Sequence, residues 1–559
     1  MNIHPGNGKT AQITLLFLIS ALLTLSARSQ TTRQIGLSID IRDRSLDVKI
    51  EVPANDLDKT AFSLSDWAGQ DNYAENIYRV SAREKAGGRA LTTGKTGART
   101  WTIENAKKAF ELSYTVVSQK NSFMGDNVRN HFHPTLFRDY VFLWGAAFLF
   151  FPDQKETADL PVKLRIAPNE YGRVYANFGD RADSFNDLND LLIAAGDYQP
   201  VEKKIGGRDV TFLIQGKNWK FTGQEFAETV AGIIAAQVRY MGFSPSNDKL
   251  LITLNEGTPF SKGGTVVKNV ISVYPNPQSE LKDFDNLKLI AHENFHFWNG
   301  NYWHSDGKKP EGYYKWMSEG FTEYYSGLTL YREGLIDERE FVGWLNQLLL
   351  EYQTNPVALT ATAEVLGENY WKSRDYNRLP YVKGALIALL IDIIVRQKTS
   401  EKKQIDDLMK LMIEKTDSQT GYNDELLLNN LNQLTGTGNR RFYDDFIIGA
   451  KFLPITETLK SSGITAAETP RQVFELGFSI EGGRFERGVR VKEVISGSNA
   501  EKAGLKPGDQ LNGFSIGFGN PEEEAKFNVQ RGEEKLDIKF FPRKTADILQ
   551  IDPNAKFPK

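Results

Sequence analysis

The spacing of hydrophobic residues changes twice along the chain. From 34 to 164, stretches such as LSIDIRD, SLDVKIEVP and FELSYTVV place apolar residues at every second position, between turn signals such as Ala86-Gly87-Gly88. This period of two predicts an antiparallel β domain. From 283 to 449 apolar residues recur at three- and four-residue spacing, which predicts helices. Short alternating stretches return after Pro454, so we expect a second β module there.

Two strongly apolar runs call for different interpretations. ITLLFLISALLTL, at 13–25, follows Lys9 and precedes Ala27-Arg28-Ser29, which predicts a cleavable signal peptide over 1–29. A membrane anchor is the alternative, but the run is shorter than the ~20 residues that span a bilayer. VFLWGAAFLFF, at 141–151, ends at Pro152 and predicts a buried strand and turn. We therefore expect an exported protein without a stable membrane span after cleavage, and the periplasm fits this composition.

Composition narrows the function classes. A chain of 559 residues is long enough for about three or four domains. Its 68 basic and 71 acidic residues give a net charge of −3, which does not favour nucleic acid as a partner. The absence of cysteine excludes disulfides, thiolate metal sites and cysteine nucleophiles. Histidine occurs only six times, so a histidine cluster is informative.

Such a cluster lies in LKLIAHENFHFWNG. His292 and His296 are four residues apart, so a helix would place both imidazoles on one face, toward one ion. Glu293 would face the same cleft beside a metal-activated water. Catalytic zinc needs a third protein ligand and an open position, and Glu319, 23 positions after His296 on a second predicted helix, can supply that ligand. Glu323 is either a carboxylate that orients a ligand imidazole or an exposed helix acid.

A fourth element is the tyrosine that precedes the apolar stretch ALIALLIDII. Pro380 favours the first turn of a helix, so Tyr381 would lie at the positive end of that helix. A phenol at this place can hydrogen-bond the oxyanion of a tetrahedral intermediate. The alternative is a packing tyrosine, one of 21 in the chain.

Together these residues resemble the gluzincin metallopeptidases and, within them, the glycyl aminopeptidase family, metallopeptidase family sixty-one. Three blocks carry the resemblance: HENFHFWN at 292–299, WMSEGFTEYY at 316–325 and YVKGALIALLID at 381–392. The resemblance implies a multidomain α+β fold. Its expected parts are the signal peptide (1–29), an N-terminal antiparallel β domain (30–168), a thermolysin-like zinc catalytic domain (169–330), a helical domain (331–455), a C-terminal PDZ domain (456–545) and a tail (546–559).

The resemblance also implies roles for individual residues. His292, His296 and Glu319 match the ligands of one Zn²⁺ per chain, Glu293 matches the general base, and Tyr381 matches the tyrosine that stabilises the transition state. In related enzymes a glutamate on the substrate-binding edge strand holds the free α-amino group. This strand reads Gly263-Gly264-Thr265-Val266 here, with valine at the acidic position. Because valine cannot pair with an ammonium group, we expect altered recognition of the substrate N-terminus. Glu256 lies nearby in sequence as a candidate substitute.

The C-terminal module resembles a PDZ domain. Leu476-Gly477-Phe478 resembles the carboxylate-binding loop of such domains, and the segment 498–509 resembles the turn-rich segment of exported bacterial proteases. A peptide C-terminus is the ligand expected there, against the alternative of a purely structural role. The predicted function is an exported, zinc-dependent, aminopeptidase-like hydrolase of peptides or proteins. The alternative is a catalytically inactive protein that binds peptides through its cleft and PDZ domain.

Overall fold

The computed structural model describes residues 33–67, 72–118, 131–167, 169–244, 249–257, 263–300, 302–416, 421–483 and 485–559. The chain divides into two compact units, Met1–Gln199 with Glu256–Lys262 and Pro200–Asn255 with Gly263–Lys559. The predicted signal peptide, 1–29, lies outside the described residues. The finer division into domains stays a prediction.

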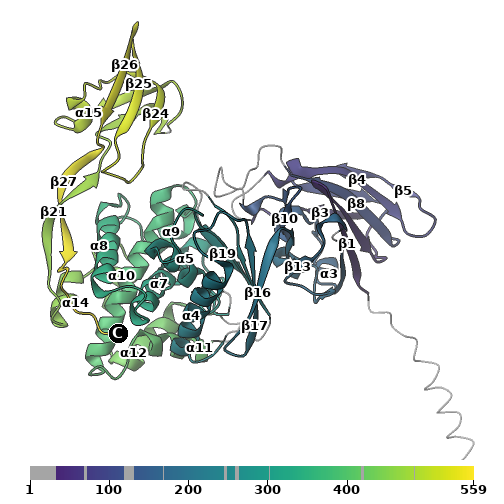
Figure 1. Ribbon diagram of the computed structural model, residues 1–559, viewed down its shortest axis with the longest axis horizontal. Helices are drawn as coiled ribbons and strands as arrows, with labels where there is room; N and C mark the ends of the chain where they lie inside the picture. The colour runs from purple at the N-terminus through teal and green to yellow at the C-terminus, as the bar shows by residue number, and fades with distance from the viewer. Residues whose placement is uncertain are drawn as a thin grey trace, which may run out of the picture. The chain divides into compact units, whose positions relative to one another are not determined.

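The first unit is built from β-sheets, as the alternating pattern predicts (Figure 1). In β1 (Ile35–Arg42) the residues at every second position, from Ile35 to Ile41, are fully buried. The largest sheet has seven strands. In spatial order they are β14 (Arg181–Ala182), β12 (Val162–Ala167), β1, β2 (Ser45–Val52), β8 (Phe110–Val117), β4 (Ile77–Glu84) and β5 (Ala90–Leu91). Its ladders are antiparallel except for the parallel pair β1–β12.

Two four-stranded sheets complete this unit. One contains β11 (Phe151–Pro152), β3 (Lys59–Ser63), β7 (Thr100–Glu104) and β6 (Thr93–Lys95), and the other β13 (Val174–Ala176), β15 (Leu192–Gly196), β10 (Tyr140–Trp144) and β9 (Thr135–Leu136). The apolar run at 141–151 forms most of β10, the buried helical turn α2 (Gly145–Phe148) and the start of β11. The prediction of a buried strand and turn is therefore confirmed, with a helical turn between two strands.

A five-stranded sheet opens the second unit. Its order is β16 (Tyr198–Ile205), β17 (Arg208–Gln215), β18 (Leu250–Leu254), β20 (Val270–Tyr274) and β19 (Gly263–Val267). The ladders β17–β18 and β18–β20 are parallel, whereas β19 runs antiparallel to β20 and forms the edge. Among the described strands, β19 therefore has a neighbour on one of its two edges only.

Helices make up most of the described residues between 223 and 461. They are α4 (Gly223–Met241), α5 (Phe284–Phe295), α6 (Lys315–Ser318), α7 (Gly320–Arg332), α8 (Glu338–Thr354), α9 (Ala363–Asn369), α10 (Arg374–Lys398), α11 (Ile405–Glu414), α12 (Asp424–Thr435), α13 (Arg440–Phe442) and α14 (Ile455–Ser461). Within the described part of the chain, no helix is both long enough and apolar enough to cross a membrane.

The predicted start of the helix at Pro380 is wrong. α10 begins six residues earlier, at Arg374, where the Ser373 side chain accepts a hydrogen bond from the Tyr376 N–H. Pro380 lies inside the helix, so the bond that its missing N–H would make to the Tyr376 carbonyl is absent. Tyr381 is thus in the third turn of α10, and the positive end of this helix does not act on its phenol.

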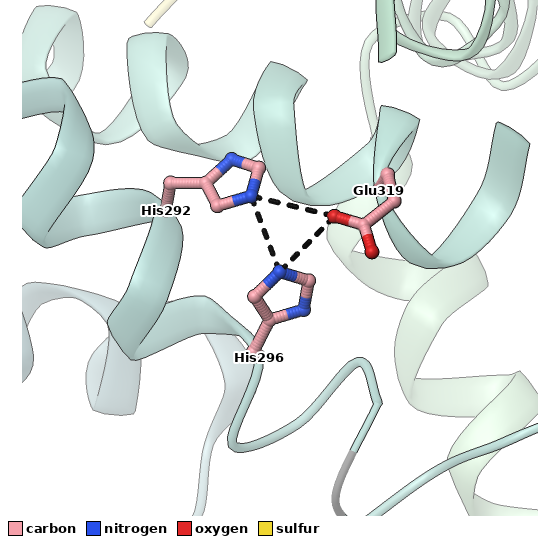
Figure 2. A group of neighbouring side chains, drawn as sticks. All are labelled: His292, His296 and Glu319. Atoms are coloured by element: carbon pink, nitrogen blue, oxygen red, sulfur yellow. Dashed lines mark hydrogen bonds and ion pairs between the residues drawn. The ribbon is translucent and has the colours of Figure 1, made fainter. Parts of the chain in front are cut away.

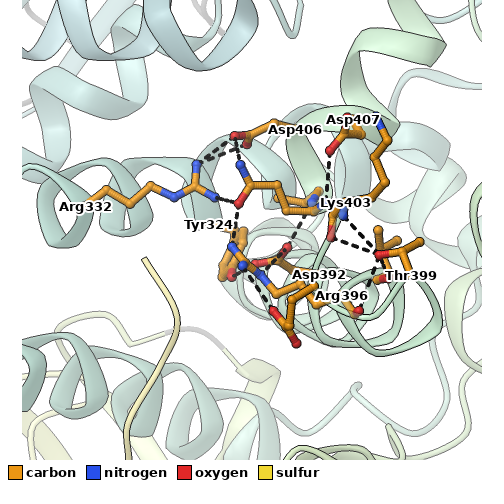
Figure 3. Close-up of polar contacts among 12 residues, drawn as sticks. Tyr324, Arg332, Asp392, Arg396, Thr399, Lys403, Asp406 and Asp407 are labelled. Carbon is orange, nitrogen blue, oxygen red and sulfur yellow. Dashed lines mark hydrogen bonds and ion pairs between the residues drawn. The ribbon is translucent and has the colours of Figure 1, made fainter.

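A buried polar network holds α7 against α10 and α11 (Figure 3). The Tyr324 hydroxyl donates to Asp392 at 3.1 Å, and Arg396 donates to the other carboxylate oxygen of Asp392 at 3.2 Å. Arg332 donates to Asp406 at 2.9 Å. Each of these five side chains has an oppositely charged or hydrogen-bonding partner, as buried charges require, although Arg332 Nε itself has no hydrogen-bond partner among the described residues. The network fixes the helix whose N-terminal end carries Glu319 and Glu323.

The C-terminal module contains a second five-stranded sheet around its own apolar core. The strand order is β22 (Phe478–Ile480), β23 (Val489–Val494), β24 (Gln510–Ser515), β25 (Ala525–Arg531) and β26 (Glu534–Phe540), with the short helix α15 (Asn499–Lys502) between β23 and β24. β21 (Ala466–Phe474) and β27 (Arg543–Ile551) form a separate two-stranded ribbon. A tail was expected from 546, but β27 continues to Ile551 and exchanges hydrogen bonds with Asn346 of α8.

Candidate metal centre

Three predicted side chains converge on one point (Figure 2). His292 lies in the last turn of α5, His296 forms the C-terminal cap of that helix, and Glu319 lies between α6 and α7. The Nε2 atoms of the two imidazoles are 3.1 Å apart, and Glu319 Oε2 lies 3.6 Å from His292 Nε2 and 3.3 Å from His296 Nε2. Two imidazole nitrogens and one carboxylate oxygen at this spacing form a donor set that suits zinc.

The two elements that carry this donor set are joined by Asn299. Its backbone carbonyl lies 2.9 Å from His296 Nδ1, which fixes the orientation of that imidazole. Its fully buried side-chain amide donates to the Met317 carbonyl at 2.9 Å and to Thr322 Oγ1 at 3.1 Å. Asn299 therefore ties the end of α5 to the α6–α7 junction where Glu319 lies.

Glu323 contacts the other imidazole of the donor set. Its Oε2 atom lies 3.2 Å from His292 Nδ1, and its Oε1 atom accepts a hydrogen bond from Lys288 Nζ at 2.8 Å. Burial lowers the pKa of His292, but hydrogen bonds to Glu319 and Glu323 outweigh it and raise this pKa to about 9. Burial raises the pKa of Glu323, but Lys288 and His292 bring it well below its usual range. Of the two interpretations of Glu323, the buried carboxylate beside His292 agrees with the structure, and the exposed helix acid does not.

The third member of the donor set, the Glu319 carboxylate, also has a lysine partner. Lys315 Nζ donates to Glu319 Oε1 at 3.2 Å, so that Oε2 is the oxygen that faces the histidines. Burial raises the pKa of Glu319, but His296, His292 and Lys315 together hold it well below its usual value. The carboxylate is therefore anionic, as a metal ligand must be.

Glu293 lies at the edge strand β19. It is buried, and burial raises its pKa although His292 and His296 act to lower it. A Cβ atom on Gly264 would lie 2.7 Å from the Glu293 Cγ atom, so only glycine leaves room for this carboxylate. The glycine of the predicted substrate strand is thus in contact with the predicted base.

Tyr381 reaches the centre because α10 packs unusually closely on α6 and α7. A Cβ on Gly384 would lie 2.0 Å from the Trp316 carbonyl oxygen, and a Cβ on Gly320 would lie 2.4 Å from the Gly384 Cα. The Tyr381 ring stacks on the His292 imidazole, with centroids 5.9 Å apart. Burial, and then the neighbouring Glu319 and Tyr370, raise the pKa of Tyr381, so its phenol keeps its proton.

Val266 stands in β19 at the position where an amine-binding glutamate is expected. Val266 is half-buried and packs against the apolar core. Whether Glu256, in the first compact unit, takes over the role of the missing acid stays a prediction. Gly263 and Thr265 complete the edge strand.

The PDZ loop is preorganised by a left-handed glycine. Gly477 has φ of 76°, and its carbonyl accepts hydrogen bonds from the Ile495 N–H at 2.7 Å and from Ser498 Oγ at 3.2 Å. Phe478 is buried in the core of the module, and Leu476 packs against that core. The loop leads into β22, a strand at the edge of its sheet.

Several supporting residues were not predicted from the sequence. Lys315 lies four residues before its partner Glu319, so helical charge spacing was the available signal for it. Lys288 pairs with Glu323, 35 residues away, which helical spacing does not indicate. Asn299 and Tyr370 act through contacts distant in sequence, which no local pattern reveals.

The chain was also compared with family models, curated proteins and solved structures. Residues 285–387 match the model of the M61 glycyl aminopeptidases, 34–186 match the M61 peptidase N-terminal domain, and 466–513 match the PDZ domain. The crystal structure of an aminopeptidase N family protein from Idiomarina loihiensis has a similar fold, with a TM-score of 0.72 and 19% identity over 93% of this chain and 98% of that chain. An M1 zinc metallopeptidase from Deinococcus radiodurans aligns with a TM-score of 0.46 and 13% identity, over 76% of this chain and 94% of that chain. No curated protein matched significantly.

The three family models and the Idiomarina loihiensis structure confirm the resemblance to the glycyl aminopeptidases and the multidomain α+β fold with a C-terminal PDZ domain. The match to the glycyl aminopeptidase family model supports a metallopeptidase.

Proposed function

We propose that this chain is an exported zinc-dependent peptidase that hydrolyses peptide bonds, with one zinc ion held by His292, His296 and Glu319. The observation that carries the proposal is the convergence of these three donor atoms, all within 4.8 Å of one another. Zinc commonly takes three protein ligands of this kind in catalytic sites and keeps a fourth position open.

The neighbouring residues supply the remaining functions of a peptidase. Bound zinc would supply Lewis acidity toward water and the substrate carbonyl. The Glu293 carboxylate takes a proton from the attacking water and passes it to the leaving amine, and its raised pKa suits both transfers. The Tyr381 O–H donates a hydrogen bond to the developing oxyanion. Glu323 keeps the His292 imidazole in place through Nδ1.

We expect the substrate to bind along the edge of β19 that pairs with no other described strand. An extended peptide can add to this edge as a further strand through main-chain hydrogen bonds, which brings its carbonyl to the side where Glu293 lies. Val266 offers no charge to a free α-amino group, so we propose an aminopeptidase-like enzyme with altered N-terminal recognition. The PDZ loop would bind a peptide carboxylate in the same manner at β22.

Two matched peptide sets test this proposal, one with free N-termini and one acetylated. Zinc-loaded protein should cleave peptides, and mass spectrometry of the products should show cleavage in both sets. Glu293→Gln should abolish turnover while zinc analysis still finds one ion per chain. Full activity of the Glu293→Gln variant would exclude Glu293 as the base, and cleavage of the free set alone would show that another group binds the amine.

Export rests on the pattern at 1–29 and has its own test. The mature N-terminus of the protein from its native host, determined by mass spectrometry, should lie near Ser29 or Gln30. An intact N-terminus at Met1 would contradict export by a cleaved signal.

A further inference from the structure

Tyr381 directly follows a gap in the hydrogen-bond ladder of α10. Pro380 has no N–H to donate to the Tyr376 carbonyl, so one helical hydrogen bond is missing in the turn that leads to Tyr381. Beyond Tyr381, α10 is fixed by its close approach to α6, where a Cβ on Gly384 would lie 2.0 Å from the Trp316 carbonyl oxygen. A fixed place for the phenol therefore also needs contacts that hold the preceding turn.

Arg378 lies in that turn and makes such a contact. Its Nε atom donates to Glu351 Oε2 of α8 at 2.8 Å, and both side chains are half-buried. A second contact lies one turn earlier, where the Asn355 amide at the end of α8 donates to the Asp375 carbonyl at 3.0 Å. α8 thus holds the part of α10 that precedes Tyr381 at two places.

The same guanidinium lies over the ring of Tyr381. The two residues are three positions apart, which makes them neighbours on the helix surface. Arg378 Cζ is 5.6 Å from the ring centroid, within the ~6 Å at which a cation is attracted to an aromatic face. The ring also stacks on the His292 imidazole, with 5.9 Å between centroids and 14° between planes. Tyr381 is therefore in contact with both a candidate zinc ligand and Arg378.

Arg378 has a weaker contact with Glu323. Its Nη2 atom lies 3.9 Å from Glu323 Oε1, whereas Lys288 Nζ donates to the same oxygen at 2.8 Å. Because the attraction between charges falls with distance, Lys288 is the stronger counter-charge, and it stays in place when Arg378 is replaced. The effect of Arg378 on the reaction should therefore pass through Tyr381 and not through the zinc ligand beside Glu323.

We propose that Arg378 is a positioning residue, which Glu351 anchors to α8 and which holds the Tyr381 phenol where it can donate to the oxyanion. The inference rests on the proposed peptidase function and adds a residue to it. Arg378 exchanges no proton in the reaction, because a guanidinium stays protonated.

Steady-state kinetics of the zinc-loaded full chain with one peptide substrate test this role. Arg378→Gln should lower kcat about tenfold, equivalent to ~1.4 kcal/mol in the barrier, and leave KM within twofold. Arg378→Lys keeps the cation but loses the planar fork, so its kcat should lie between those of the wild type and Arg378→Gln. Zinc affinity, measured by competition with a chromophoric chelator, should stay within twofold of wild type in both variants.

Arg543→Gln is the matched control. Arg543 of β27 has the same two kinds of contact, since its guanidinium lies over the Phe541 ring at 4.7 Å and donates to Glu522 at 2.8 Å. This variant should keep the kcat of the wild type. An unchanged kcat in Arg378→Gln, or a loss of zinc affinity as large as its loss of kcat, would overturn the proposal.

A double-mutant cycle shows whether Arg378 acts through the phenol. Tyr381→Phe removes the hydroxyl, so adding Arg378→Gln to it should change kcat by less than twofold, because no donor is left to position. A merely structural role of Arg378 would lower kcat by the same factor in both backgrounds. A tenfold decrease that persists in the Tyr381→Phe background would therefore refute the positioning role.

A spectroscopic measurement separates this inference from the proposed function. With 3-fluorotyrosine in place of Tyr381, ¹⁹F NMR of the zinc-loaded full chain should give one narrow resonance. Arg378→Gln should shift or broaden this resonance, and Arg543→Gln should not. Failure of the wild type to cleave any peptide would refute the peptidase function, and the resonance would still decide whether Arg378 holds the ring. A resonance that Arg378→Gln leaves unchanged would overturn the inference.

Discussion

The carboxylate of Glu323 should set the zinc affinity of the neighbouring centre. Glu323→Gln keeps the shape of the side chain and an acceptor for His292 Nδ1, 3.2 Å away, but removes the charge. Loss of such a supporting partner typically costs 10- to 100-fold in metal affinity. Because the amide still accepts a hydrogen bond, we expect the lower end of this range, about tenfold or ~1.4 kcal/mol.

Competition with a chromophoric chelator measures this affinity. Glu333→Gln is the matched control, since Glu333 follows α7 directly and pairs with Arg239 at the surface, far from the donor set. It should bind zinc as the wild type does. Circular dichroism checks that both variants keep their helices, because Glu323 also neutralises Lys288. A zinc affinity of Glu323→Gln within twofold of wild type would refute the role given to this carboxylate.

Three further predictions follow from single contacts. Tyr381→Phe removes one hydrogen-bond donor to the oxyanion, so steady-state kinetics should show kcat lowered by about 10²- to 10³-fold with little change in KM. A decrease of only twofold would exclude Tyr381 as an oxyanion donor. Gly264→Ala would place a Cβ 2.7 Å from Glu293 Cγ, so kcat should fall at least about tenfold. In the control Gly232→Ala, in α4, the added Cβ would have no atom within 4 Å, so this variant should keep full activity. Burial raises the pKa of Asp509, but Arg531, with both contacts at 2.7 Å, brings it below its usual value. Asp509→Asn should therefore cost ~1–3 kcal/mol in local unfolding of the PDZ module by hydrogen exchange. Because the pKa of Asp509 is depressed in the folded state, the wild type should have the larger free energy of local unfolding above about pH 4. This advantage over Asp509→Asn should vanish as the pH falls through the folded-state pKa. A free-energy difference that is independent of pH would contradict this ion pair.

Local spacing was sufficient to predict the donor set. His292 and His296 share a helical face because they are four residues apart, and Glu319 starts a second helix that packs on the first. The alternating pattern of the first unit likewise predicts sheets, because one face of each strand is buried.

Long-range contacts account for what the sequence did not reveal. The role of Asn299 depends on the α6–α7 junction, 18 or more residues away, which no periodicity encodes. Pro380 suggested a helix start, but the stronger N-terminal signal is Ser373, and a proline is tolerated where neighbouring packing compensates for one lost hydrogen bond. A cavity of about 420 Å³ beside Glu323 is lined by residues of α5, α7, α8 and α10, and the sequence pattern does not predict how these helices pack.

Reversible metal dependence tests the central claim most directly. Protein stripped of metal by a chelator should lose peptide cleavage, and titration with zinc should restore it with an endpoint of one ion per chain. Alanine at His296 should abolish both the stoichiometric binding and the recovery. Cleavage that persists in the metal-free protein, or zinc binding at one ion per chain without any peptide cleavage, would contradict a zinc peptidase.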